Sequence, residues 1–154
     1  MHQASFALAA TLVLVAPAIA AGPQWESGWG MGITEAWIEL DPANRIDVAC
    51  TGGYGRPIAN VAFTLGGKTP PANSLVTVTV DGGKPMEVPM GDDGTLRSDS
   101  NFEARWFDAV IEALKFGQLA VVAYDGAIAA FPLAGSAEAI GDCPADYWRT
   151  DLDR

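Results

Sequence analysis

Apolar and polar residues alternate along much of the chain, with the period of two that is typical of half-buried strands. The clearest run is RIDVACT (Arg45 to Thr51), in which Ile46, Val48 and Cys50 share one face. In such a strand one face is apolar and the other is polar, so the pattern predicts strands that each bury one face. The same alternation marks VAFTLGG (Val61 to Gly67), LVTVTV (Leu75 to Val80) and PMEVPM (Pro85 to Met90).

Glycine turns divide these runs into antiparallel hairpins. Asp81-Gly82-Gly83 separates LVTVTV from PMEVPM, and Asp125-Gly126 separates QLAVVAYD from AIAAFPLA. Asp-Gly pairs favour the left-handed backbone that two-residue hairpin loops need. The last two runs are so apolar that we expect both faces of each strand to be buried. The run ITEAWIEL (Ile33 to Leu40) is mixed and fits either a strand or a helix.

One stretch has the period of a helix. Ser100 and Glu103 have capping-box spacing, and a stripe that includes Phe102 and Trp106 repeats every four residues. We predict a helix from Asn101 to Phe116, packed on a sheet. Gly117 follows it, and we expect this glycine to take the left-handed conformation that ends many helices.

These elements predict an α+β fold, mainly an antiparallel β-sandwich with one main α-helix (about 101–116) and a short C-terminal helical turn. The turn is expected over Ala137 to Ile140, with the hydroxyl of Ser136 as its cap.

The first twenty residues have the features of a signal peptide. An apolar stretch from about Phe6 to Ala16 is followed by Pro17 and by the A-x-A motif Ala18-Ile19-Ala20. The stretch is shorter than the roughly 20 residues that a membrane span needs. We therefore predict cleavage after Ala20, a single β-rich globular domain over residues 21–154, periplasmic or secreted localisation, and no stable membrane span after cleavage.

Export changes the interpretation of the two cysteines, Cys50 and Cys143. In an oxidising compartment, a lone pair of cysteines most simply forms one disulfide. Cys50 also lies on the apolar face of its predicted strand. We predict a Cys50–Cys143 disulfide that joins the C-terminal turn to this strand.

Charge and histidine content narrow the function. The chain has 9 basic and 19 acidic residues and a formal net charge of −10, which disfavours nucleic acid as a partner. Its only histidine, His2, lies in the predicted leader. A mature chain without histidine excludes Ser-His-Asp, Cys-His and histidine-zinc chemistry. We expect no catalytic residues, no metal site and no cofactor.

The segment from Trp25 to Trp37 is the best candidate for a binding edge. It is rich in glycine and includes Trp25, Trp29 and Trp37 with Glu35 between them. Carboxylates near tryptophans also allow two alternatives, a carboxylate-based hydrolase and a carbohydrate-binding domain. The acidic surface allows a third, an inhibitor or immunity protein that masks a cationic partner. The leading hypothesis is a non-enzymatic periplasmic accessory or protein-binding module whose protein partner and oligomeric state are unknown.

The C-terminal half resembles small exported bacterial β-sandwich domains, the group that includes invasion-associated locus B proteins and type VI secretion-associated accessory proteins. The resemblance rests on VTVDGG, FEARWFDAVIEALKFGQLAVVAYDG and FPLAGSAEAIGDC. It implies a periplasmic β-sandwich with an added helix that acts as a binding or accessory module, and it brings no catalytic residue. The matching positions are Asp81, Gly82, Leu114, Gly117, Phe131, Leu133, Gly135, Ala139, Ile140 and Cys143.

Overall fold

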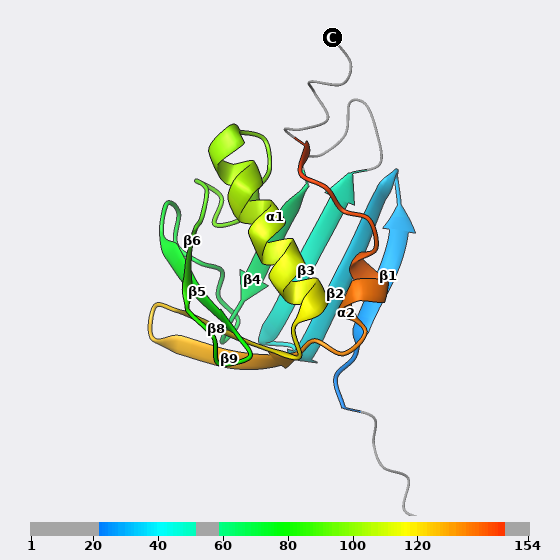
Figure 1. The fold of residues 1–154 in the computed structure, drawn as a ribbon. Helices are drawn as coiled ribbons and strands as arrows, with labels where there is room; N and C mark the ends of the chain where they lie inside the picture. The colour runs from blue at the N-terminus through cyan, green and yellow to red at the C-terminus, as the bar shows by residue number, and fades with distance from the viewer. Residues whose placement is uncertain (1–21, 52–58, 147–154) are drawn as a thin grey trace, which may run out of the picture.

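Two antiparallel sheets and a long helix make up the computed structural model, which describes residues 22–51 and 59–146 (Figure 1). The predicted signal peptide lies outside the described residues. Where the chain is described, the predicted class is confirmed, since the fold is mostly antiparallel sheet with one main and one short helix. Neither of these helices has the length and apolar composition that a bilayer crossing requires.

The five-stranded sheet holds most of the N-terminal half, in the order β1-β2-β3-β4-β7. The mixed run at residues 33–40 is a strand, and its side chains alternate between the core and the outer face. On the inner face Ile46 lies opposite Ile38 on one side and Phe63 on the other, and all three are buried. The strands are β1 (Trp25–Gly30), β2 (Ile33–Asp41), β3 (Asn44–Thr51), β4 (Asn60–Thr64) and β7 (Leu96–Arg97).

The four-stranded sheet has the order β6-β5-β8-β9. The predicted two-residue turn between β8 and β9 is confirmed, with φ of 47° at Asp125 and 76° at Gly126. The expectation that both faces of β8 and β9 are buried is wrong, because Leu119 and Ile128 are exposed. The described part of the domain covers only the inner face of this sheet. The strands are β5 (Leu75–Val80), β6 (Met86–Pro89), β8 (Leu119–Tyr124) and β9 (Ala127–Pro132).

The predicted main helix is confirmed as α1 (Asn101–Phe116), which crosses the inner face of the five-stranded sheet in Figure 1. Ser100 caps it, because its Oγ accepts from the amide of Glu103 at 3.2 Å. The Glu103 carboxylate accepts from the Ser100 hydroxyl at 2.7 Å. The buried face of the helix consists of Ala104, Phe107, Val110, Ile111 and Leu114.

Gly117 ends α1, but the left-handed conformation expected there is wrong. Its φ of −83° and ψ of 177° are extended. A Cβ atom on Gly117 would lie 2.2 Å from Cγ1 of Val80 and 2.9 Å from Cδ1 of Leu133. Glycine is required here because the chain passes close to two core side chains.

The short helix α2 (Ser136–Ile140) lies at the residues expected for the C-terminal turn, but Ser136 does not cap it. Gly135 is the N-cap residue, with φ of 87° and no capping side chain. The fully buried Ser136 hydroxyl lies 2.7 Å from the carbonyl oxygens of both Leu114 and Leu133. Carbonyls in the last turn of a helix lack helical partners, so the hydroxyl serves the end of α1.

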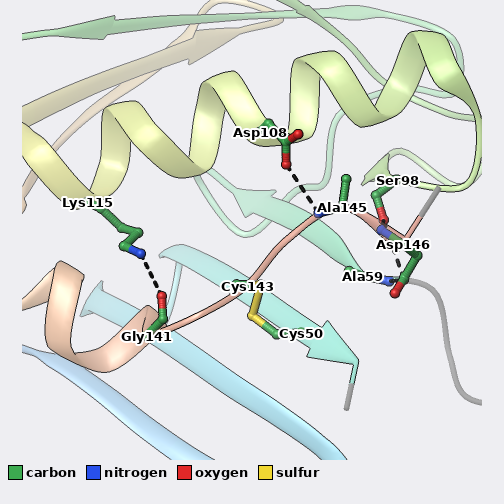
Figure 2. The surroundings of a disulfide bond; sticks show 9 residues. All are labelled: Cys50, Ala59, Ser98, Asp108, Lys115, Gly141, Cys143, Ala145 and Asp146. Carbon is green, nitrogen blue, oxygen red and sulfur yellow. Dashed lines mark hydrogen bonds between the residues drawn. A yellow bond between two sulfur atoms is a disulfide. The ribbon is translucent and has the colours of Figure 1, made fainter. Parts of the chain in front are cut away.

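The predicted disulfide between Cys50 and Cys143 is confirmed, with a Cα–Cα distance of 5.3 Å. Figure 2 shows it between β3 and the segment that follows α2. Lys115 of α1 donates to the carbonyl of Gly141 at 2.6 Å, and Asp108 accepts from the amide of Ala145 at 3.2 Å. The segment is therefore attached to the sheet by a covalent bond and to α1 by hydrogen bonds.

Further along the same segment, Asp146 joins two more elements. Its backbone amide donates to Oγ of the buried Ser98 at 3.1 Å, and its carboxylate accepts from the amide of Ala59. Ser98 follows β7 and Ala59 precedes β4, and Figure 2 shows both residues beside Asp146. Asp146 thus joins this part of the chain to the β4–β7 end of the five-stranded sheet, opposite β1.

Candidate functional site

The β1–β2 hairpin carries all four residues of the predicted binding edge. Its two strands pair through a two-residue turn, in which Met31 has φ of 50° and Gly32 has φ of 80°. The hairpin lies at one border of the five-stranded sheet (Figure 1). The structure distributes the four residues among the core, the outer face of the sheet and the end of the hairpin.

Trp25 belongs to the core end of the hairpin. It is only 9% exposed and lies opposite Ile38 on the inner face. Its indole Nε1 donates to the carbonyl oxygen of Pro132 at 3.0 Å. Trp25 therefore anchors β1 to the rest of the domain and leaves little surface for a partner.

Trp37 lies on the outer face of the sheet, where it packs with an ion-pair network. The guanidinium carbon of Arg45 is 5.4 Å from the centre of the Trp37 ring. Arg45 also pairs with Asp47 at 2.6 Å and with Glu39 at 3.1 Å. The hydrogen bond to Asp47 is the main reason that the pKa of Arg45 is raised. This network fixes the guanidinium above the indole ring.

The other side of Trp37 is covered by β1. A Cβ atom on Gly28 would lie 3.3 Å from Cζ3 of the Trp37 ring, so the ring lies close against the backbone of Gly28. Gly28 is paired with Glu35, which is exposed on the same outer face. Trp37 is thus half-buried between Gly28 and Arg45, with Glu35 beside it.

Trp29 and Met31 form the exposed end of the hairpin, called here the hairpin tip. Trp29 is 77% exposed and Met31 is 97% exposed. Trp29 pairs with Thr34, so it lies on the opposite face of the hairpin from Glu35 and Trp37. The structure therefore does not gather the three tryptophans into one surface, and Trp29 alone of them is strongly exposed.

Sequence reasoning missed Met31. Both central residues of a type I′ turn have positive φ, which favours asparagine, aspartate or glycine over a residue such as methionine. The signal was present in GWGMG, where an apolar residue stands between two glycines at the turn. The turn places a flexible, polarisable side chain in solvent next to Trp29.

Two of the carboxylates near the tryptophans, Glu39 and Asp41, have other partners in the structure. Glu39 pairs with Arg45, and Asp41 accepts from the amide of Ala43 and the side chain of Asn44 at the β2–β3 turn. The Asn44 hydrogen bond is the main reason that the pKa of Asp41 is lowered. The hydrolase and the carbohydrate-binding domain stay predictions that no feature of the hairpin favours.

A second polar cluster, which sequence reasoning missed, lies at the start of α1. Arg97 is 3.1 Å from Asp99 and 3.8 Å from Asp93. A hydrogen bond with Asp99 is the main cause that raises the pKa of Glu103, and the Ser100 hydroxyl acts in the opposite direction. Arg97, Asp99 and Glu103 border an open cleft of about 430 Å³. Among the described residues, no group of three or more histidine, cysteine or carboxylate side chains is arranged to hold a metal ion.

Comparison with known proteins gives one family. The family model described as YfjT matches residues 23–140, which include both sheets, α1 and α2. No curated protein and no protein of solved structure matches the chain.

Proposed function

This chain belongs to the YfjT family, and we propose that it is a non-enzymatic protein-binding module that acts in the periplasm or outside the cell. The hairpin tip is its contact surface, and Trp29 and Met31 are the residues that enter the partner.

The observation that carries this proposal is the exposure of Trp29 and Met31 at the end of a two-stranded hairpin. Tryptophan and methionine are enriched in protein interfaces, and tryptophan is frequent among the few residues that dominate binding energy. An indole in water gains by burial in a partner, and methionine adapts to irregular surfaces. Because the hairpin is already ordered as part of a sheet, its backbone loses little conformational freedom on binding.

Two features support action outside the cytoplasm. The Cys50–Cys143 disulfide is of the kind that persists in oxidising compartments. The N-terminal twenty residues have the apolar stretch and A-x-A motif of an export signal. The proposed similarity to locus B and type VI secretion-associated domains is in keeping with such a location.

The experiment is affinity capture with the full chain, expressed with its own leader and purified from the periplasmic fraction. Captured partners are identified, and their affinity is measured for Trp29→Ala/Met31→Ala. The control is Phe102→Ala/Phe116→Ala, which truncates two similarly exposed aromatic residues on α1.

We expect the tip variant to bind at least about 30-fold more weakly, because truncating a central interface residue costs about 2 kcal/mol or more. The control is expected to bind as the wild type does. A partner that binds both variants equally well would show that the hairpin tip is not the contact surface. Turnover of a peptide or glycan by the pure protein would contradict the non-enzymatic assignment.

A further inference from the structure

Strand β9 is an unprotected sheet edge. It is the outermost strand of the four-stranded sheet, and its sequence AIAAFP (Ala127–Pro132) has no charged residue. Ile128, the second residue of the strand, is 70% exposed. Figure 1 shows β9 along the lower margin of the molecule. Exposed apolar edge strands are templates for pairing with another chain.

The other three sheet edges carry the usual protection against such pairing. β1 has the exposed charged residue Glu26, and β7 is only two residues long. β6 has exposed Glu87 between Pro85 and Pro89. Charge, proline and short length each discourage edge-to-edge association. Residues 127–131 of β9 include neither a charged residue nor a proline.

The hydrogen-bond pattern shows which groups of β9 face outward. Leu133 donates its amide to Gln118 at 2.8 Å, so the odd-numbered positions of this ladder face β8. In an antiparallel pair, alternate residues direct both N–H and C=O to the neighbour. Ile128 and Ala130 therefore direct their N–H and C=O away from β8, at the free edge.

Both ends of this free edge are blocked. Pro132 has no N–H, and its carbonyl already accepts from Trp25. Gly126 lies in the turn with φ of 76°, which is incompatible with an extended ladder. The edge thus offers two N–H and two C=O groups, on Ile128 and Ala130.

We propose that two copies of this chain associate by antiparallel pairing of their β9 strands, with a twofold axis at Ala129. Ile128 of one copy then lies opposite Ala130 of the other, and each such pair exchanges two hydrogen bonds. The two four-stranded sheets become one continuous sheet. A second copy fits because, in this register, each free N–H of one edge meets a free C=O of the other. Shifting the register by two residues would place Ile128 opposite Pro132, which cannot donate, or Ala130 opposite Gly126 in the turn.

β9 itself has no charged residue, so pairing along this strand does not place acidic side chains of the two strands opposite each other. Each copy carries a formal net charge of −10, so two copies repel wherever their acidic surfaces meet. Asp125 is the nearest acidic residue in sequence to the β9 edge. In the proposed register, the two copies of Asp125 lie eight residues apart along the ladder, roughly 26 Å at about 3.3 Å per residue. That is well beyond a Debye length of about 8 Å, so their repulsion is screened.

The contact is short, so the dimer is expected to be weak and reversible. The contact consists of four hydrogen bonds and two isoleucine side chains. The surface that it buries is smaller than the roughly 1,200 to 2,000 Å² that stable interfaces bury. Sedimentation of the wild type should therefore show a monomer at about 10 µM and a substantial dimer fraction at about 1 mM.

Two variants and a control test the geometry. Ala130→Pro removes an outward N–H while leaving the bonds to β8 intact, and Ile128→Lys places two positive charges near the twofold axis. Each is expected to weaken the dimer at least about tenfold, because Ala130→Pro alone removes two of the four hydrogen bonds. Phe102→Lys, on an exposed site of α1, is the matched control and should dimerise as the wild type does.

Amide hydrogen exchange provides the positional test. On going from low to high concentration, exchange at Ile128 and Ala130 should slow, because these amides become hydrogen-bonded in the dimer. A wild type that stays monomeric up to about 1 mM would overturn the proposal. So would a dimer that persists in both β9 variants, or one whose formation leaves exchange at Ile128 and Ala130 unchanged.

Discussion

The indole Nε1 of Trp25 donates a hydrogen bond to the carbonyl oxygen of Pro132, 3.0 Å away. Trp25 begins β1 at the border of one sheet, and Pro132 ends β9 at the border of the other. The bond joins residues 107 positions apart in the chain. It therefore closes one side of the sandwich between two edge strands.

Trp25→Phe removes this donor while keeping an aromatic ring in the core. We expect the free energy of unfolding to fall by about 1 to 2 kcal/mol, since the Pro132 carbonyl loses its partner and the smaller ring leaves a gap. Urea denaturation followed by circular dichroism measures the change. Trp29→Phe is the matched control, and because Trp29 is exposed it should change stability by less than about 0.5 kcal/mol. Equal effects of the two variants would contradict the role given to Trp25.

Gly117→Ala tests the close passage of the chain after α1. The added methyl group would lie 2.2 Å from Cγ1 of Val80, so one of the two must move. We expect a loss of about 1 to 3 kcal/mol, as for other overpacked cores. The double variant Gly117→Ala/Val80→Ala should lose less than the sum of the two single variants. Gly30→Ala is the control, because a Cβ atom there meets nothing within 4 Å. A fully additive double variant would mean that Val80 is not the residue that excludes the methyl group.

Most strands and α1 could be predicted because their patterns are local, but β1 was not expected as a strand and the run of β2 fitted either a strand or a helix. Alternation over a few residues marks a strand, and the capping spacing of Ser100 and Glu103 marks the start of a helix. Which faces are covered is a tertiary property. Ile128 lies in an apolar run, but among residues 22–51 and 59–146 no element packs on its outer face. The same limit explains Gly117 and Ser136, whose roles depend on Val80, Leu133 and Leu114.

At the candidate site, too, local patterns could be predicted from the sequence and tertiary placement could not. The clustering of tryptophans and glycines predicted a binding edge between Trp25 and Trp37, but it did not indicate that this segment forms a hairpin. That the segment binds a partner stays a prediction. Sequence reasoning could not separate Trp25 from Trp29, since the assignment of each to the core or to solvent depends on where β1 extends beyond the core. The free edge of β9 was also hidden, because strand order is set by topology and not by the pattern of one strand.

Replacing both cysteines, as Cys50→Ala/Cys143→Ala, should destabilise the domain strongly. The disulfide joins residues 93 positions apart, and in the chain-entropy description a loop of this size contributes about 4 to 5 kcal/mol. Urea denaturation with and without dithiothreitol measures the effect. The wild type should lose stability on reduction, and the double variant should not respond to the reductant. A double variant within about 1 kcal/mol of the oxidised wild type would contradict this prediction.

The carboxyl of Glu103 is expected to make stability depend on pH. A hydrogen bond with Asp99, together with burial and the charge on Asp99, raises its pKa above the usual value of 4.5. The folded chain therefore holds this proton more tightly than the unfolded chain does. Its contribution to stability is complete below about pH 4.5 and is lost as the pH rises through the raised pKa.

Glu103→Gln keeps an acceptor for the Ser100 hydroxyl but cannot ionise. Relative to the wild type, its free energy of unfolding should rise as the pH increases above about 4.5 and become constant once the carboxyl of Glu103 is ionised in the folded chain. Urea denaturation at a series of pH values measures this difference. In Asp99→Asn, which lacks the carboxyl whose hydrogen bond and charge raise the pKa of Glu103, Glu103→Gln should produce a smaller change with pH. A difference between wild type and Glu103→Gln that is the same at every pH would show that Glu103 titrates alike in the folded and unfolded chains.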